Sequence, residues 1–135
     1  MHTVQRNFID LNPIIPLFKN DPDIMALYVL GSAATGSMRP DSDIDLAILY
    51  EPGHEHTALR RAEIAADATC ALGRDVDCGE VSSRNLVYAR EAILKGRRLF
   101  ARDAFRADSM ETNLLGMYTR FNEDRREVLD AYRTR

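Results

Sequence analysis

Two uninterrupted apolar runs dominate the pattern of hydrophobic and polar positions along this chain. The first covers residues 24–30, and the second, Leu46-Ala-Ile-Leu-Tyr50, follows directly after Asp43-Ile-Asp45. Short apolar runs bounded by turn-forming residues are typical of β-strands. We therefore expect strands over residues 24–30 and 43–50, with Glu51-Pro-Gly53 ending the second strand.

Helical and strand-like patterns alternate through the rest of the chain. Asn12-Pro13 is a suitable cap and first residue for a short helix before the first strand. Gly73 and Gly96 are placed to end two later helices. The remaining elements are expected to be helices over residues 12–18, 57–72 and 84–95, and short strands over residues 75–81 and 98–100.

The last thirty or so residues predict one long helix. Asp108-Ser-Met-Glu111 resembles a capping box that would open this helix, which reaches about Tyr132. In one interpretation the helix packs on the sheet of its own domain; in the other, its length leaves apolar surface for a partner. The apolar stripe in question consists of Leu114, Tyr118, Phe121, Val128 and Tyr132.

This order of elements predicts an α/β (α+β) fold with a small mixed sheet flanked by helices. At 135 residues the chain is long enough for one modest hydrophobic core. We expect a single domain over residues 1–135, with its core at about 20–100 and a C-terminal helical extension at 103–135.

Charge and hydropathy exclude several classes of protein. The net charge of −3 argues against a basic surface that coats nucleic acid, so no direct nucleic-acid binding is expected. No segment reaches the roughly 18 continuous apolar residues of a membrane span, and the first residues lack a secretory signal. We expect a cytoplasmic protein in which Cys70 and Cys78 are reduced and buried.

The candidate catalytic residues lie between the two apolar runs. Side chains alternate along a strand, so Asp43 and Asp45 point to the same face. Two carboxylates this close repel each other unless a cation lies between them, and Mg²⁺ prefers such oxygen ligands. The small residues at 31–36 leave backbone N–H groups open to a phosphate. Together these features indicate phosphoryl or nucleotidyl transfer.

These residues carry a family resemblance. Gly31-Ser32, ten intervening residues and then Asp43-x-Asp45 resemble the signature of the DNA polymerase β-type nucleotidyltransferase superfamily. The short chain is similar to the minimal nucleotidyltransferases (MNT), such as the MntA-type antitoxins of HEPN/MNT toxin–antitoxin systems. Ala33 and Ala34 stand where minimal members often have Arg, and aminoglycoside-modifying relatives share this feature.

The resemblance implies a role for each site residue. Asp43, Asp45 and a third carboxylate, Asp77 or else Asp75, would hold Mg²⁺, with two ions about 3.5–4 Å apart. Asp77 would also accept the proton of the attacking hydroxyl. Gly31 and Ser32 would hold the phosphates of ATP, the nucleotide donor.

The resemblance also implies a partner. AMP would be transferred to a hydroxyl, most simply a tyrosine, of a cognate HEPN ribonuclease toxin, which would thereby be neutralised. This chain lacks the Arg-x(4–6)-His motif of such toxins, so the toxin is expected to be another chain. Two alternatives remain open: an antitoxin that only binds and masks the toxin, and a nucleotidyltransferase for a small aminoglycoside-type molecule.

A second group of potential metal ligands lies in the Pro-Gly loop after the second strand. It comprises Glu51 and the run His54-Glu55-His56. Its spacing is not the i, i+4 pair of a helical zinc site, so we expect a solvated loop here.

Overall fold

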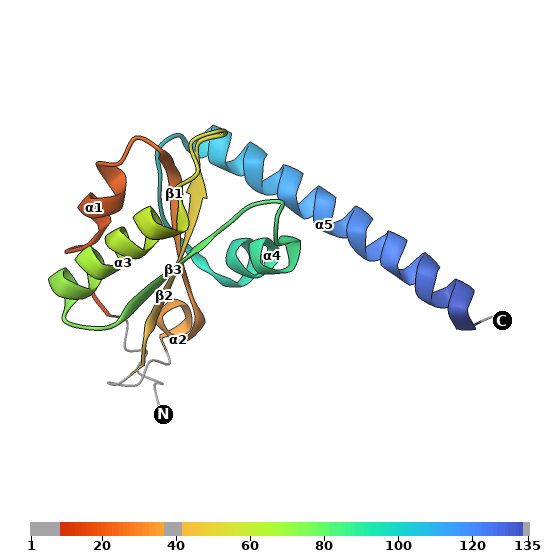
Figure 1. Ribbon diagram of the computed structural model, residues 1–135, viewed down its shortest axis with the longest axis horizontal. Helices are drawn as coiled ribbons and strands as arrows, with labels where there is room; N and C mark the ends of the chain where they lie inside the picture. Colours follow the sequence, from red (N-terminus) through yellow and green to blue (C-terminus); the bar gives the residue numbers. More distant parts are fainter. Residues whose placement is uncertain (1–8, 37–41, 134–135) are drawn as a thin grey trace, which may run out of the picture.

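A computed structural model describes residues 9–36 and 42–133, and the structural statements below concern these residues. The elements follow the expected alternation of helices and strands (Figure 1). In chain order they are α1 (Ile15–Lys19), β1 (Ile24–Leu30), α2 (Gly31–Thr35), β2 (Ile44–Tyr50), α3 (Ala58–Leu72), β3 (Val76–Glu80), α4 (Leu86–Lys95), β4 (Arg97–Ala101) and α5 (Ala104–Arg133).

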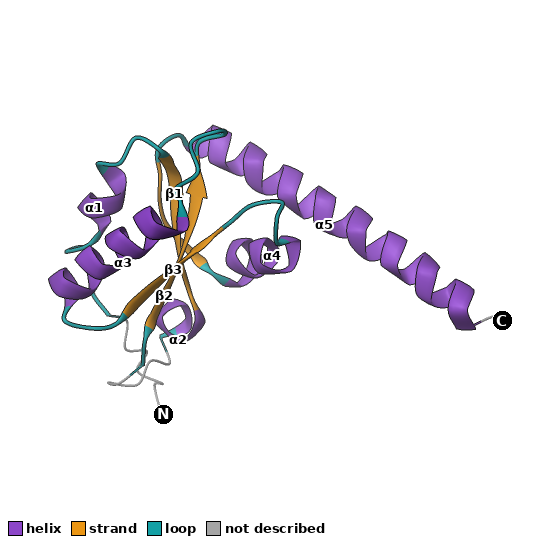
Figure 2. Cartoon of the chain, viewed as in Figure 1, coloured by secondary structure: helices purple, strands orange, loops and turns teal. Residues whose placement is uncertain are grey.

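The four strands form one mixed sheet in the order β3-β2-β1-β4. β1 runs antiparallel to both β2 and β4, whereas β2 and β3 are parallel. The two central strands are the two apolar runs of the sequence, and helices cover both of their faces (Figure 2). Double-sided burial explains why these strands are apolar throughout instead of alternating. The predicted α/β fold with a small mixed sheet is confirmed.

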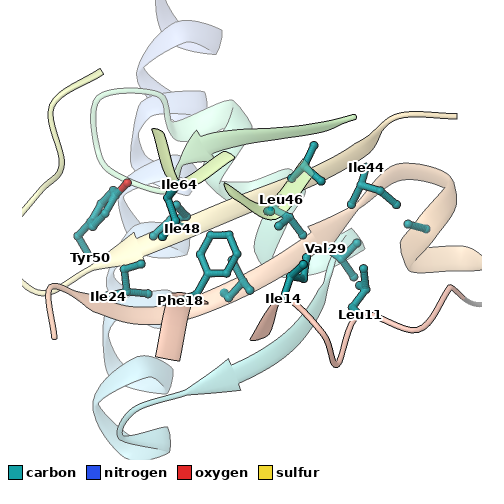
Figure 3. Close-up of a cluster of buried hydrophobic side chains, with 14 residues drawn as sticks. Leu11, Ile14, Phe18, Ile24, Val29, Ile44, Leu46, Ile48, Tyr50 and Ile64 are labelled. Atoms are coloured by element: carbon teal, nitrogen blue, oxygen red, sulfur yellow. The ribbon is translucent and has the colours of Figure 1, made fainter. Parts of the chain in front are cut away.

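One hydrophobic core lies between the sheet and helices α1 and α3 (Figure 3). Phe18 of α1 and Ile64 of α3 enter it from the helices. The strands contribute alternate residues, except at an irregularity of the β1–β2 register between Ile24 and Ala26. These strand residues are Ile24, Leu27, Val29, Ile44, Leu46, Ile48, Tyr50 and Val76.

A second core lies between the opposite face of the sheet and helices α4 and α5. Small residues of the two helices, Ala89 and Ala92 on α4 and Ala107 on α5, let them approach the sheet and each other closely. Tyr28 and Leu30 are among the β1 residues on this face. The β2 residues of this second core are Ala47 and Leu49. Side chains alternate along a strand, so Asp45, two residues before Ala47, belongs to the same face, as would Asp43 if the alternation continues before the strand.

Local capping explains where several helices begin and end. Thr57 caps α3 by accepting a hydrogen bond from the backbone N–H of Arg60, and Gly73 ends it in the left-handed region with φ of 72°. Asn85 caps α4 by accepting from the N–H of Tyr88. These two helices therefore lie within two residues of the predicted ranges.

The start of the final helix was predicted wrongly. α5 begins at Ala104, because the Asp103 side chain accepts a hydrogen bond from the backbone N–H of Arg106 and caps the helix there. Asp108 and Glu111 do not form a capping box. Both instead accept hydrogen bonds from the Arg98 guanidinium, at 2.8 and 2.6 Å, and so tie α5 to β4.

Only the first part of α5 packs on the domain. Leu114 is buried, and Arg90 of α4 stacks over the Tyr118 ring at 5.2 Å. Beyond this point the helix projects away from the sheet (Figure 1). The interpretation that the whole stripe packs on its own sheet is therefore wrong for the second part of the helix. The exposed apolar side chains there are Met117, Phe121, Val128, Leu129 and Tyr132.

Two smaller expectations can be compared with the structure. Both cysteines are free, as expected, but Cys70 is exposed and Cys78 is only half-buried. Among the described helices, none is long and apolar enough to cross a membrane.

The first core makes a prediction about stability. Phe18 is completely buried, so Phe18→Ala should lower the free energy of unfolding by about 3–5 kcal/mol through lost burial and the cavity left behind. Urea unfolding monitored by circular dichroism measures this loss. Phe105, which is 79% exposed on α5, provides the matched control. A Phe105→Ala change as costly as Phe18→Ala would contradict the assignment of the core.

Candidate active site

The candidate site begins where β1 ends. Gly31 has a φ of 64°, a left-handed conformation that lets the chain turn at once from the strand into α2. The antiparallel register pairs Leu30 with Asp45, so this turn lies beside the first residues of β2. A Cβ atom on Gly31 would lie 3.7 Å from Asp45 Oδ2. The Gly31-Ser32 turn and the acid pair, predicted as parts of one site, are brought together.

The third carboxylate comes from the neighbouring strand. β3 is parallel to β2, and the register pairs Asp45 directly with Asp77. Partners in adjacent strands present their side chains to the same face of a sheet. Asp43 directly precedes β2, and its charge acts on Asp45. All three side chains are exposed and available to a ligand.

The two candidates for the third acid occupy different hollows. Asp77 and Asp45 line a pocket of about 390 Å³ whose other walls include Tyr88 of α4. Asp75 lies just before β3 and lines an adjoining hollow of about 430 Å³ together with Asp43. Its backbone carbonyl is engaged by the N–H of Ile44 at 2.8 Å. This arrangement favours Asp77 as the acid that acts with Asp45.

Electrostatics agree with a cation-binding role. The pKa of Asp45 is raised above its usual value, first by partial burial and then by the negative charges of Asp77 and Asp43. A carboxylate whose pKa is raised by burial and by neighbouring negative charges is stabilised when a cation neutralises it. Carboxylates are the ligands that Mg²⁺ prefers, so the three acids fit a magnesium site in the chemistry of their donor atoms.

Tyr88 also lines this pocket, although no sequence motif singled it out. Its hydroxyl packs on Gly79 of β3 so closely that a Cβ atom at Gly79 would collide with it. Burial, followed by the charge of Asp45, raises the pKa of Tyr88 to about 12. Its hydroxyl is therefore a neutral hydrogen-bonding group at physiological pH. The only available signal was its position on a helix that follows β3.

Cys78 is not a candidate nucleophile. It lines the same pocket, but burial and the charge of Asp77 raise the pKa of its thiol to about 12. The reactive form of cysteine is the thiolate, which is therefore scarce here at neutral pH.

A group of potential metal ligands lies at the other end of the central strands. The expectation of a solvated loop is correct for His54 and Glu55, which are exposed, but wrong for His56. The side chain of His56 is only 4% exposed. It lies with Asp21 and Asp23, and each residue offers one ligand atom within 4.8 Å of the others. Among the described residues, Asp43, Asp45 and Asp77 do not form such a close group. The antiparallel pairing of β1 and β2, which the sequence did not specify, places the start of one strand beside the end of the other.

Comparison with known families identifies the fold. Residues 12–105 match the family described as "Polymerase beta, Nucleotidyltransferase". The match covers more than half of the chain and includes every residue that lines the pocket of Asp45 and Asp77.

Individual relatives extend the likeness to α5. The protein adenylyltransferase MntA of Shewanella oneidensis is 28% identical over 120 residues, which are 88% of this chain and 84% of the relative. A crystal structure of a toxin-antitoxin with AMP-PNP has a TM-score of 0.78 and 25% identity, over 92% of this chain and 98% of the other.

A structure of a tri-AMPylated Shewanella oneidensis HEPN toxin in complex with an MNT antitoxin has a TM-score of 0.70 and 24% identity, over 90% of this chain and 93% of the other. At this identity the likeness establishes a common fold.

The raised pKa of Asp45 predicts a pH-dependent effect on stability. Well below about pH 4 the carboxyl is neutral in both folded and unfolded chains, so Asp45→Asn should change the melting temperature little. As the pH rises through the raised pKa, the wild type alone acquires the unfavourable charge. In EDTA at pH 7 the variant should therefore melt at a higher temperature than the wild type.

Thermal unfolding measured with and without Mg²⁺ checks this prediction. Mg²⁺ should raise the melting temperature of the wild type and leave Asp45→Asn almost unchanged. Asp124→Asn, an exposed change on α5, is the control. An Asp45→Asn variant that is less stable than the wild type in EDTA at pH 7 would contradict the repulsion among the acids.

Proposed function

This chain belongs to the polymerase beta nucleotidyltransferase family, and we propose that it is an antitoxin that transfers AMP from ATP to a hydroxyl of a cognate HEPN ribonuclease toxin. The observation that carries the proposal is the convergence of the Gly31 turn, Asp45 and Asp77 on one pocket. The name of the MntA relative, a protein adenylyltransferase, supports AMP as the transferred group. The related toxin-antitoxin with AMP-PNP supports ATP as the donor.

Gly31 and Ser32 are proposed to hold the triphosphate. They begin α2, where backbone N–H groups have no partner within the helix and can donate to phosphate oxygens. The left-handed Gly31 brings these groups next to Asp45. The phosphates would thus be held beside the carboxylates that bind the cation.

Asp43, Asp45 and Asp77 are proposed to bind two Mg²⁺ ions. When bound, the ions would neutralise the acids and the phosphates and stabilise the charge that develops during transfer. Partial burial and the negative charges of Asp77 and Asp43, which raise the pKa of Asp45, favour the binding of a cation here.

The reaction then follows from the position of the residues. The acceptor oxygen attacks the α-phosphorus of ATP, a new P–O bond forms, and the bond to the β,γ-phosphates breaks, releasing pyrophosphate. Asp77, at the exposed side of the pocket, is proposed to take the proton of the acceptor hydroxyl. AMP remains on the acceptor, which we propose to be a tyrosine of the toxin. In the related complex the HEPN toxin carries AMP.

The second part of α5 is proposed to bind the toxin. It presents Phe121, Val128 and Tyr132 to solvent, and no other described element of the chain covers them. We regard residues 1–135 as one nucleotidyltransferase domain in which α5 is the extension that holds the partner. We propose that the reaction takes place in the cytoplasm, where ATP as the donor is at hand.

The same surface favours a second candidate function, an antitoxin that neutralises the toxin by masking it. The two functions differ in one respect: masking requires α5 but not the acids, whereas AMP transfer requires both. Variants that remove each feature separately therefore distinguish the two functions.

Removing the acids should separate transfer from binding. Asp43→Ala/Asp45→Ala should reduce AMP transfer at least about 10³-fold, because the cation site is lost. Intact mass spectrometry of the toxin after incubation with ATP and Mg²⁺ measures the transfer, and co-purification measures the binding. The toxin should gain one or more AMP units with the wild type alone and bind both forms. Full neutralisation by the double variant would favour masking over transfer.

Introducing charge on the projecting part of α5 should instead weaken the binding of the toxin. Phe121→Asp/Val128→Asp should weaken toxin binding at least about tenfold, because apolar contact would be replaced by desolvated charge. Calorimetric titration measures the affinity, and Arg120→Asp on the same helix is the control for added charge. Unchanged affinity in the double variant would place the partner elsewhere on the molecule.

A further inference from the structure

A cluster of carboxylates and histidines joins the turn before β1 to the loop after β2. Asp21 and Asp23 lie in the turn, and His56 lies in the loop. Their ligand atoms fall within 4.8 Å of one another. His54 is adjacent, with Nδ1 at 3.2 Å from Asp23 Oδ1. β1 has seven residues, so this cluster and the pocket of Asp45 are separated by about 23 Å.

His56 is buried in a way that its protein contacts do not explain. Its side chain is 4% exposed, and neither ring nitrogen forms a hydrogen bond with any described residue. Nε2 does lie 2.9 Å from Asp21 Oδ2, but this contact lacks the geometry of a hydrogen bond. The 2.9 Å separation is the distance of an ion pair, yet both ring nitrogens are enclosed without a hydrogen bond. Imidazole nitrogen and carboxylate oxygen are both ligands of transition metals, so the pair suits a shared ion.

The surroundings hold these side chains in place. The Tyr50 ring lies 4.7 Å from the His56 ring and covers it. The Asp21 side chain accepts a hydrogen bond from the backbone N–H of Asp23, which fixes the turn. Arg102 donates to three backbone carbonyls around it, those of Lys19, Asp21 and Ile24. These hydrogen bonds hold the backbone that carries Asp21 and Asp23 in place.

Arg60 is the competing cation. Its guanidinium lies 3.5 Å from Asp21 Oδ2, but the side chain is 44% exposed and can turn into solvent. It partly compensates the charge of Asp21 and leaves the nitrogens of His56 without a hydrogen bond. Arg60 thus satisfies only one member of the cluster.

We propose that Asp21, Asp23 and His56 form a second metal site, specific for a transition metal such as Zn²⁺, with His54 as a fourth ligand. Two carboxylates combined with one or two imidazoles form a set of ligands that suits Zn²⁺ better than Mg²⁺. Ligand atoms around a tetrahedral zinc ion are about 3.4 Å apart, which small side-chain rotations achieve from the observed positions. The ion ties the turn before β1 to the loop after β2 and has a structural role independent of AMP transfer.

Metal binding to the full chain tests the proposal. Protein stripped with EDTA should bind one Zn²⁺ per cluster in calorimetric titration, and Zn²⁺ should raise its melting temperature. His56→Gln should weaken Zn²⁺ binding at least about tenfold, since a ligand is lost. Asp43→Ala/Asp45→Ala should leave it unchanged. Absence of Zn²⁺ binding in the wild type, or equal binding by His56→Gln, would overturn the proposal.

A measurement on the wild type alone guards against a variant that fails to fold. X-ray absorption at the zinc edge should show nitrogen and oxygen ligands at about 2.0–2.2 Å with the multiple scattering of imidazole. A zinc ion without imidazole scattering would show that His56 is not a ligand and would overturn the site. This measurement needs neither ATP nor the toxin. It therefore tests the metal site independently of the proposed function, and either proposal can fail without the other.

Discussion

The antiparallel pairing of β1 with β2 is the constraint on which the rest of this molecule depends. At one end its register places Leu30 opposite Asp45, so the turn at Gly31 meets the acid pair. At the other end it pairs Ile24 with Tyr50 and so brings Asp21 beside His56. Each strand is buried on both faces, and a slip of one residue would exchange the two cores. The observed register of this strand pair thus sets the positions of both polar clusters.

Much of this arrangement could be predicted from the sequence because its signals are local. The apolar runs and the stop at Gly73 each act within a few residues, and they placed the two central strands to within one residue and the end of α3 correctly. The alternation of side chains along a strand also predicts that Asp43 and Asp45 share one face, although β2 begins one residue after Asp43. The structure adds the register that sets Asp77 opposite Asp45 and leaves Asp75 in an adjoining hollow.

The features that were missed depend on contacts between distant segments. His56 is buried because β1 begins where β2 ends, and no spacing within residues 51–56 reveals this. Tyr88 reaches the pocket because Gly79 leaves room for its hydroxyl. α5 begins at Ala104 because Asp103 caps it, while the more conspicuous Asp108 is engaged by Arg98. In each case a long-range contact or a competing local one outweighs the sequence pattern.

The central claim is that the acids of this pocket direct attack on the α-phosphorus of ATP. Two parallel incubations of the complex with Mg²⁺, one with ATP labelled at the α-phosphate and one with ATP labelled at the γ-phosphate, test it most directly. The account predicts that the toxin acquires the α-label only and that the γ-label leaves with pyrophosphate. Transfer of the γ-label to the toxin would contradict the account, because it would show phosphorylation in place of nucleotidyl transfer.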